Sequence, residues 1–161
     1  MYCFIIVGMT GQGKSFFVNN YIGGRKCYVF DINNEYNLPL TGDRSKNVSC
    51  DENDFIKNCF LKKDTICVFE EATGFLEGKT AKNLRRLIVN KRHTKNVYFF
   101  VFHSISSVPP RILQLSNFVV LFKTNDEDYQ VQDKYPSLYE YYLRLKEMPH
   151  QSKLIIKTIP Q

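Results

Sequence analysis

A glycine-rich segment near the start of the chain constrains the fold more than any other feature. Residues 8–15 are GMTGQGKS, which matches G-x-x-x-x-G-K-[ST] at every fixed position, and they follow an apolar run at residues 2–7. Glycines at these positions let the backbone curl so that successive N–H groups point at a phosphate chain. Lys14 is then placed to reach the β- and γ-phosphates, and Ser15 to give its hydroxyl to Mg²⁺. The pattern predicts a strand, a phosphate-binding loop and a helix that together bind a nucleoside triphosphate.

The helix that begins near Gly13 adds the positive end of its dipole to this site. The alternative interpretation is a glycine-rich turn that binds nothing, and we disfavour it because the motif and its strand-to-helix context agree. We therefore expect nine consecutive residues to bind the nucleotide: Gly8, Met9, Thr10, Gly11, Gln12, Gly13, Lys14, Ser15 and Phe16.

Size and composition indicate one globular domain. The chain has 161 residues, of which 43% are hydrophobic and 24% charged, so it is long enough to bury a core. No apolar run approaches the roughly 20 residues of a spanning helix, so we expect no transmembrane segment. The five cysteines form no C-x-x-C pair. We interpret them as reduced residues of an intracellular protein, without a zinc site.

Apolar runs of strand length alternate with helical patterns along most of the chain. This alternation predicts a three-layer α/β sandwich with a mainly parallel central sheet. We expect strands at residues 2–7, 26–32, 65–69, 96–102 and 118–122, and helices at 16–21, 51–61, 79–91 and 111–115. Residues 39–43 are expected to form an irregular loop, and residues 125–133 are acidic and polar. A helix at 138–145 and a strand at 153–159 complete the predicted elements.

Two acids, Glu70 and Glu71, end the third predicted strand. Ligands of open parallel sheets bind at the carboxyl ends of the strands, so this pair is expected beside the phosphates. We assign Glu70 to the metal and Glu71 to the attacking water, which one carboxylate must orient or deprotonate. The alternative is an acidic pair that complements a helix dipole, which the residues fit equally well in isolation.

The fourth predicted strand ends in His103 and Ser104. If this strand lies between the strands that carry the glycine-rich loop and the two acids, its end faces the γ-phosphate. His103 is then a candidate sensor of that phosphate, although a histidine at a strand end is often structural. Asp31 and Glu35 follow the second strand, where they are candidates for contact with the nucleotide or a neighbouring subunit.

A basic block lies between the acidic pair and the end of the fifth strand. Residues 79–124 contain lysines and arginines but no acid, which suggests a polyanionic partner or an acidic subunit. The alternative is a solvated basic face. We expect sequence-independent DNA contacts from Lys79, Lys82, Arg85 and Arg86. Arg92 is the first candidate for an arginine finger that acts on an adjacent subunit, followed by Arg111 and Arg86.

Residues 2–124 resemble the FtsK–HerA superfamily of DNA-pumping ATPases. The resemblance rests on the segments GMTGQGKS, VFDINNEY, CVFEEA, KRHTKNVYFFVFHS and VPPRIL. The subgroup that the chain most resembles is the genome-packaging ATPases of tailless icosahedral, membrane-containing viruses. Zonula-occludens-toxin-like ATPases of filamentous phages are the second choice, but they normally carry a membrane-spanning helix. The chain departs from the superfamily at His103, where glutamine is common, and at Glu70, where aspartate is usual.

The resemblance implies a RecA/ASCE-like P-loop NTPase that uses ATP and Mg²⁺ to translocate DNA into a preformed capsid. It further implies a homo-oligomeric ring of five or six subunits, partners at the capsid vertex, and a place in the host cytoplasm or with the virion. The single domain would comprise a core at about residues 2–124 and a C-terminal helix-strand appendage at about residues 125–161. A small-molecule kinase and a nucleotide-gated scaffold remain the rival functions.

Overall fold

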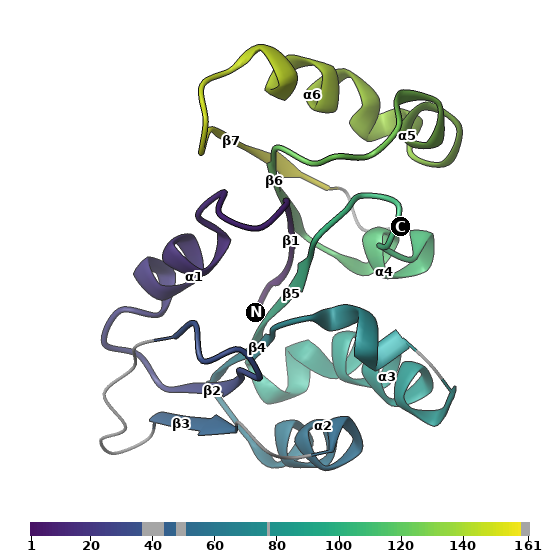
Figure 1. Ribbon diagram of the computed structural model, residues 1–161. Coiled ribbons are helices and arrows are strands. Elements are labelled where there is room, and N and C mark those ends of the chain that lie inside the picture. The colour runs from purple at the N-terminus through teal and green to yellow at the C-terminus, as the bar shows by residue number, and fades with distance from the viewer. Residues whose placement is uncertain (37–43, 48–50, 77, 159–161) are drawn as a thin grey trace.

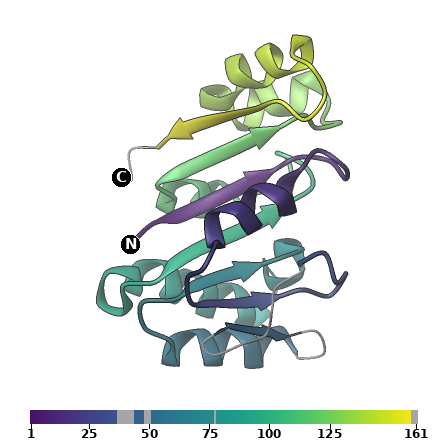
Figure 2. The same ribbon diagram turned by 90° about the vertical axis from the view of Figure 1, so that its left-hand side faces the viewer.

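The computed structural model describes residues 1–36, 44–47, 51–76 and 78–158, and within them one sheet organises the fold. The strands lie in the order β3-β2-β4-β5-β1-β6-β7. In chain order they are β1 (Cys3–Val7), β2 (Cys27–Phe30), β3 (Arg44–Asn47), β4 (Ile66–Phe69), β5 (Val97–Phe102), β6 (Phe118–Phe122) and β7 (Lys153–Lys157). All neighbouring strands pair in parallel except β6 and β7, which are antiparallel. Figure 2 shows this directly, since only β7 points the opposite way.

Helices cover both faces of the sheet, as the alternation of elements predicts. The helices are α1 (Lys14–Ile22), α2 (Glu52–Leu61), the 3₁₀ helix η1 (Ala72–Leu76), α3 (Gly78–Thr94), α4 (Pro110–Leu115), α5 (Asp128–Lys134) and α6 (Pro136–Glu147). In Figure 1, α1 lies on one side of the sheet, whereas α2, α3 and α4 lie on the other. The fold is therefore a three-layer α/β sandwich with a mainly parallel central sheet, and this prediction is confirmed.

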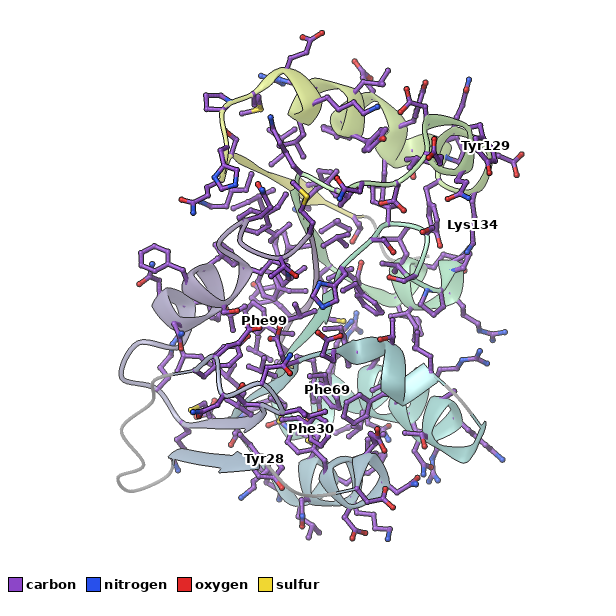
Figure 3. All side chains as sticks on the ribbon, in the orientation of Figure 1. Tyr28, Phe30, Phe69, Phe99, Tyr129 and Lys134 are labelled. Carbon is purple, nitrogen blue, oxygen red and sulfur yellow. The ribbon has the colours of Figure 1, made fainter. Side chains whose placement is uncertain are left out.

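Side chains alternate between the two faces along each strand, so the sheet separates two apolar clusters. Phe69 packs in the cluster beneath α2 and α3, and Phe99 packs in the cluster beneath α1; both are labelled in Figure 3. Strands buried on both faces must be apolar at every position, which explains the continuous apolar runs in the sequence.

The strand order places β5 between β1 and β4, as the interpretation of His103 required. The register pairs Val7 of β1 with Phe102 of β5, and Phe69 of β4 with Phe100 of the same strand. The residues that follow these three strands therefore leave the sheet at one edge. That edge holds the glycine-rich loop, the acidic pair and His103.

Three elements within the described residues were not predicted, namely β3, the 3₁₀ helix η1 and α5. Strand β3 consists of Arg44, Ser45, Lys46 and Asn47, and it carries no apolar signal because it lies at the edge of the sheet. Helix α5 lies where only an acidic, polar stretch was noted. The loop predicted at residues 39–43 lies outside the described residues.

The C-terminal segment is continuous with the main sheet. Strand β7 pairs with β6 along its whole length, from Phe118 opposite Lys157 to Phe122 opposite Lys153. Val131 of α5, Leu138 of α6 and Tyr135 between the two helices belong to the same apolar cluster as residues of α2 and α3. The segment beyond residue 124 therefore contributes to the packing of the central sheet.

No helix among the described residues is long and apolar enough to cross a lipid bilayer. Cys3, Cys27, Cys59 and Cys67 are buried and carry free thiols. Burial raises the pKa of the Cys3 thiol to about 12, so this group is protonated and packs as a small apolar side chain.

Candidate nucleotide-binding site

The glycine-rich loop adopts the curled conformation that its sequence predicts. Gly11 and Gly13 have φ values of 81° and 90°, which side chains other than glycine rarely tolerate. Gly8 is required for a different reason, because a Cβ at this position would lie 2.6 Å from the Cβ of Phe122. The loop is anchored to the sheet by two backbone hydrogen bonds, from the Gly8 amide to the Phe102 carbonyl at 3.1 Å and from the Met9 amide to the Lys123 carbonyl at 2.9 Å.

A cleft of about 340 Å³ opens over this loop. Its wall combines the loop with residues from two other parts of the chain: Thr10, Gly11, Gly13, Lys14, Ser15, Phe16, Glu35 and His103. Six of the nine residues predicted to bind nucleotide line this cleft. The other three, Gly8, Met9 and Gln12, do not line it, and the amides of Gly8 and Met9 bond to Phe102 of β5 and to Lys123 just after β6.

Lys14 is 5% exposed, although its ammonium group is charged in water at neutral pH. Burial lowers the pKa of this group, and the nearby carboxylates of Glu70, Glu35 and Glu71 oppose that shift. Its Nζ donates a hydrogen bond to the Met9 carbonyl at 3.1 Å, within the same loop. An ammonium held in a partly desolvated cleft interacts with phosphate more strongly than one in bulk water.

Glu70 is a buried carboxylate, 2% exposed, at the end of β4. Its Oε2 accepts a hydrogen bond from the hydroxyl of Tyr36 at 2.5 Å. Burial raises the pKa of Glu70 from 4.5 to about 7, and the Tyr36 hydroxyl and the Lys14 charge oppose part of that shift. The pattern of the sequence pointed to Glu70, but it contained no sign that Tyr36 would be its partner.

Glu71 lies beside His103, as expected for residues that end neighbouring strands. His103 Nε2 is in hydrogen-bond contact with Glu71 Oε1, and Asn33 Nδ2 lies 3.5 Å from the same oxygen. Glu71 has a φ of 54°, in the left-handed region that a glutamate rarely adopts. Such backbone strain is concentrated at functional sites, because the surrounding structure must hold it in place.

The loop after β2 also contributes residues to the site, in addition to the glycine-rich loop and the ends of β4 and β5. The buried carboxylate of Asp31 accepts hydrogen bonds from the backbone amides of Glu35, at 2.8 Å, and Tyr36, at 3.1 Å. The carboxylate of Glu35 in turn accepts a hydrogen bond from the hydroxyl of Ser15. The position of Asp31 and Glu35 after the second predicted strand was the signal that singled out this loop in the sequence.

The turn between α6 and β7 also touches the glycine-rich loop. The Gln151 backbone amide donates to Gln12 Oε1 at 3.2 Å, and its side-chain amide donates to the Gly11 carbonyl at 3.3 Å. The ammonium of Lys153 lies 5.7 Å from the centre of the Phe17 ring. Residues 139 positions apart in sequence thus meet at the site, and no local pattern indicates it.

The basic residues of α3 lie apart from the cleft. Lys82, Arg85, Arg86 and Arg92 are exposed, while the side chain of Lys79 lies outside the described residues. The end of α3 is held near the start of the strands, because the Thr94 carbonyl accepts from the Asp64 amide at 2.9 Å just before β4. Strand β5 spans roughly 20 Å, so Arg92 is remote from the site of its own chain.

A larger cavity of about 510 Å³ lies elsewhere, between α4, the start of α6 and β7. Its lining includes Leu113, Tyr135 and Tyr141, and none of the residues that the sequence assigned to a site. We therefore place the chemistry in the smaller cleft, where the glycine-rich loop meets Glu35 and His103.

The residues of the cleft suit Mg²⁺. The ion prefers oxygen ligands, retains several waters and is bound through one or two carboxylates together with substrate phosphates. Ser15 in the cleft wall offers such an oxygen, and so does Glu70, which is largely shielded from solvent close to Lys14 and is not itself part of the wall. The described residues contain no cage of three or more histidine, cysteine or acidic side chains, so phosphate oxygens would have to complete this coordination.

The fold, the curled loop and the acidic pair at the carboxyl edge define the class of P-loop NTPases. Among solved structures, the chain is similar to the genome-packaging NTPase B204 of Sulfolobus turreted icosahedral virus 2 in complex with ATPγS. The TM-score is 0.74 and the identity 13%, over 98% of each chain. It is also similar to the DNA-packaging ATPase B204 of Sulfolobus turreted icosahedral virus, with a TM-score of 0.73 and 14% identity over 98% of each chain. No protein-family model and no curated protein sequence matches the chain.

The raised pKa of Glu70 predicts how stability depends on pH in the absence of metal and nucleotide. Because the folded state binds a proton that the unfolded chain releases near pH 4.5, the free energy of unfolding should fall as pH rises from 4.5 to about 7. The decrease is at most about 3 kcal/mol. Urea unfolding of the parent and of Glu70→Gln across this range measures it. The difference in unfolding free energy between the parent and Glu70→Gln should change by this amount between pH 4.5 and about 7. A difference that stays constant over this range would contradict the raised pKa of Glu70.

Proposed function

We propose that this protein is an ATP-hydrolysing motor that translocates DNA, and that its task is to package a viral genome into a preformed capsid. The observation that carries the proposal is the meeting of Lys14, Glu70, Glu71 and His103 at one edge of a sheet whose β5 lies between β1 and β4. The similarity to viral genome-packaging NTPases supports it, since it extends over nearly the whole length of both chains.

The chain's own residues account for hydrolysis as follows. The first N–H groups of α1 have no partner within the helix, so they are available to phosphate oxygens together with the Lys14 ammonium. Mg²⁺, held by Ser15 and Glu70, would offset charge on the β- and γ-phosphates. Glu71 orients the attacking water or accepts its proton, and His103 holds the Glu71 carboxylate from the neighbouring strand.

The exposed basic face of α3 binds the DNA phosphates. Lys82, Arg85 and Arg86 are exposed on this helix, which contains no acidic residue. Charges of one sign on one face bind phosphates without regard to base sequence. We further propose a homo-oligomeric ring of five or six subunits, docked at a capsid vertex in the host cytoplasm or on the virion. In such a ring Arg92 of each subunit would complete the site of a neighbour.

The test is the ATPase rate with and without double- or single-stranded DNA, measured over a range of protein concentrations. We expect DNA to stimulate the rate, and we expect the rate per subunit to rise with concentration because each site needs two subunits. Stimulation should weaken steeply as salt rises. A rate that is linear in protein and indifferent to DNA would overturn the motor and favour a small-molecule kinase. ATP binding without turnover would favour a scaffold.

A paired substitution on α3 tests the DNA surface separately. We expect Lys82→Ala with Arg85→Ala to weaken DNA affinity and to lower the salt dependence by about one unit for each phosphate that the protein no longer neutralises. The matched control is Lys63→Ala with Arg144→Ala, which removes the same charge from exposed positions outside α3. An equal decrease in DNA affinity in both pairs would show that net charge, and not the α3 face, governs binding. Fluorescence anisotropy with labelled DNA at several salt concentrations makes the comparison.

A further inference from the structure

The loop after β2 contacts three of the side chains that the sequence assigned to catalysis or metal binding. The pairs are Asn33–Glu71, Glu35–Ser15 and Tyr36–Glu70. One short segment thus reaches both carboxylates at the end of β4 and the hydroxyl of the glycine-rich loop. Of these contacts, the one between Glu35 and Ser15 bears most directly on how a metal would be held.

A serine hydroxyl that binds Mg²⁺ uses an oxygen lone pair for the metal. Its hydrogen must then point to an acceptor on another side, or the lone pair is misdirected. In this protein the acceptor is the carboxylate of Glu35. Glu70, the acid assigned to the metal, instead accepts a hydrogen bond from the buried hydroxyl of Tyr36. Two different acids therefore bind the metal and accept the hydrogen of the serine hydroxyl. Glu70 at the end of β4 is assigned the first task, and Glu35 in the loop after β2 has the second.

We propose that Glu35 is a positioning residue of the metal site. It accepts the hydroxyl hydrogen of Ser15, so that a lone pair of Oγ faces Mg²⁺, and its negative charge acts on the ion from the outer coordination shell. The proposal rests on the proposed function only in requiring that the cleft binds ATP with Mg²⁺. Neither DNA nor a neighbouring subunit is involved.

The loop is built to hold Glu35 in this place. The fully buried carboxylate of Asp31 fixes the backbone amides of Glu35 and Tyr36. Asn34 takes a φ of 56°, which asparagine tolerates better than most residues and which turns the chain back toward the cleft. Tyr36 is 1% exposed, and its buried ring anchors the end of the loop against the sheet. Glu35 is itself exposed at the cleft wall, so it is accessible from the cleft.

The experiment measures binding and not turnover. ATPγS is bound to the protein, Mg²⁺ is titrated into the complex, and the half-saturating Mg²⁺ concentration is read from nucleotide affinity. We expect Glu35→Ala to raise that concentration about 10- to 100-fold, the usual effect of removing an outer-shell partner. Affinity for ATPγS in excess EDTA should be unchanged or tighter, because one negative charge near the phosphates is gone. For Glu35→Gln, which keeps an acceptor oxygen, the half-saturating Mg²⁺ concentration should lie between those of the parent and of Glu35→Ala.

Two controls separate positioning from folding. Glu140→Ala removes an exposed carboxylate from α6 and should leave the Mg²⁺ requirement unchanged. In a Ser15→Ala background, Glu35→Ala should have a smaller effect than in the parent, because the hydroxyl that it orients is absent and only its charge is lost. Additive effects of the two substitutions, or tighter Mg²⁺ binding by Glu35→Ala, would overturn the proposal. If the parent protein binds no ATPγS with Mg²⁺, the proposed function itself fails, and the two failures are thereby distinguished.

Discussion

Glu71→Gln is expected to reduce the rate of ATP hydrolysis by about 10²- to 10⁴-fold while leaving ATP binding intact. The amide has nearly the shape of the carboxylate, so the strained backbone at residue 71 and a hydrogen bond to His103 can both persist. What disappears is the basic oxygen that orients the attacking water or accepts its proton. Single-turnover hydrolysis and equilibrium binding of ATPγS measure the two effects separately.

The matched control for this substitution is Glu70→Gln, one residue earlier. Glu70 is buried against Tyr36 and assigned to the metal, so its replacement should weaken the Mg²⁺ dependence of binding as well as turnover. The assignment of the two acids is reversed if Glu71→Gln is the variant that loses Mg²⁺-dependent binding and Glu70→Gln is the one that keeps it.

Arg92→Ala is expected to reduce turnover by about 10³- to 10⁵-fold, the range over which an arginine finger acts. The effect must come from another subunit, because the end of α3 lies near the start of the strands and roughly 20 Å from its own cleft. Arg92→Lys should recover little of the rate, since an ammonium lacks the planar fork of the guanidinium. Steady-state ATPase rates at protein concentrations that saturate assembly are the measurement.

Mixing two inactive variants tests the direction of this contact. Arg92→Ala subunits keep an intact P-loop, and Lys14→Ala subunits keep an intact Arg92. In a ring with head-to-tail contacts, an equal mixture should restore about a quarter of the interfaces. A mixture that stays inactive would show that Arg92 does not act between subunits. Arg111 and Arg86 would be substituted next, although the Arg86 guanidinium already lies 5.9 Å from the Phe60 ring.

Much of the core could be predicted from sequence because buried segments have a recognisable local pattern of apolar residues. Strands covered on both faces are apolar without interruption, as in residues 97–102, and glycines at fixed spacing mark the phosphate loop. Strand β3 has no such apolar pattern, since an edge strand needs only backbone partners and its residues are polar. Helix α5 was missed for a related reason, because its short acidic sequence buries Val131 but carries no repeating apolar face.

The class of chemistry follows from the sequence alone, since the residues that bind phosphate and activate water are adjacent along the chain or end predictable strands. The pairing of these groups is visible only in the folded molecule. Tyr36 with Glu70, Glu35 with Ser15, and Gln151 with Gly11 are contacts between segments 20 to 140 residues apart. Such pairs depend on strand order and on the path of loops between strands. The hydrophobic periodicity of single elements records which face is buried, and it does not record which neighbour a polar side chain will meet.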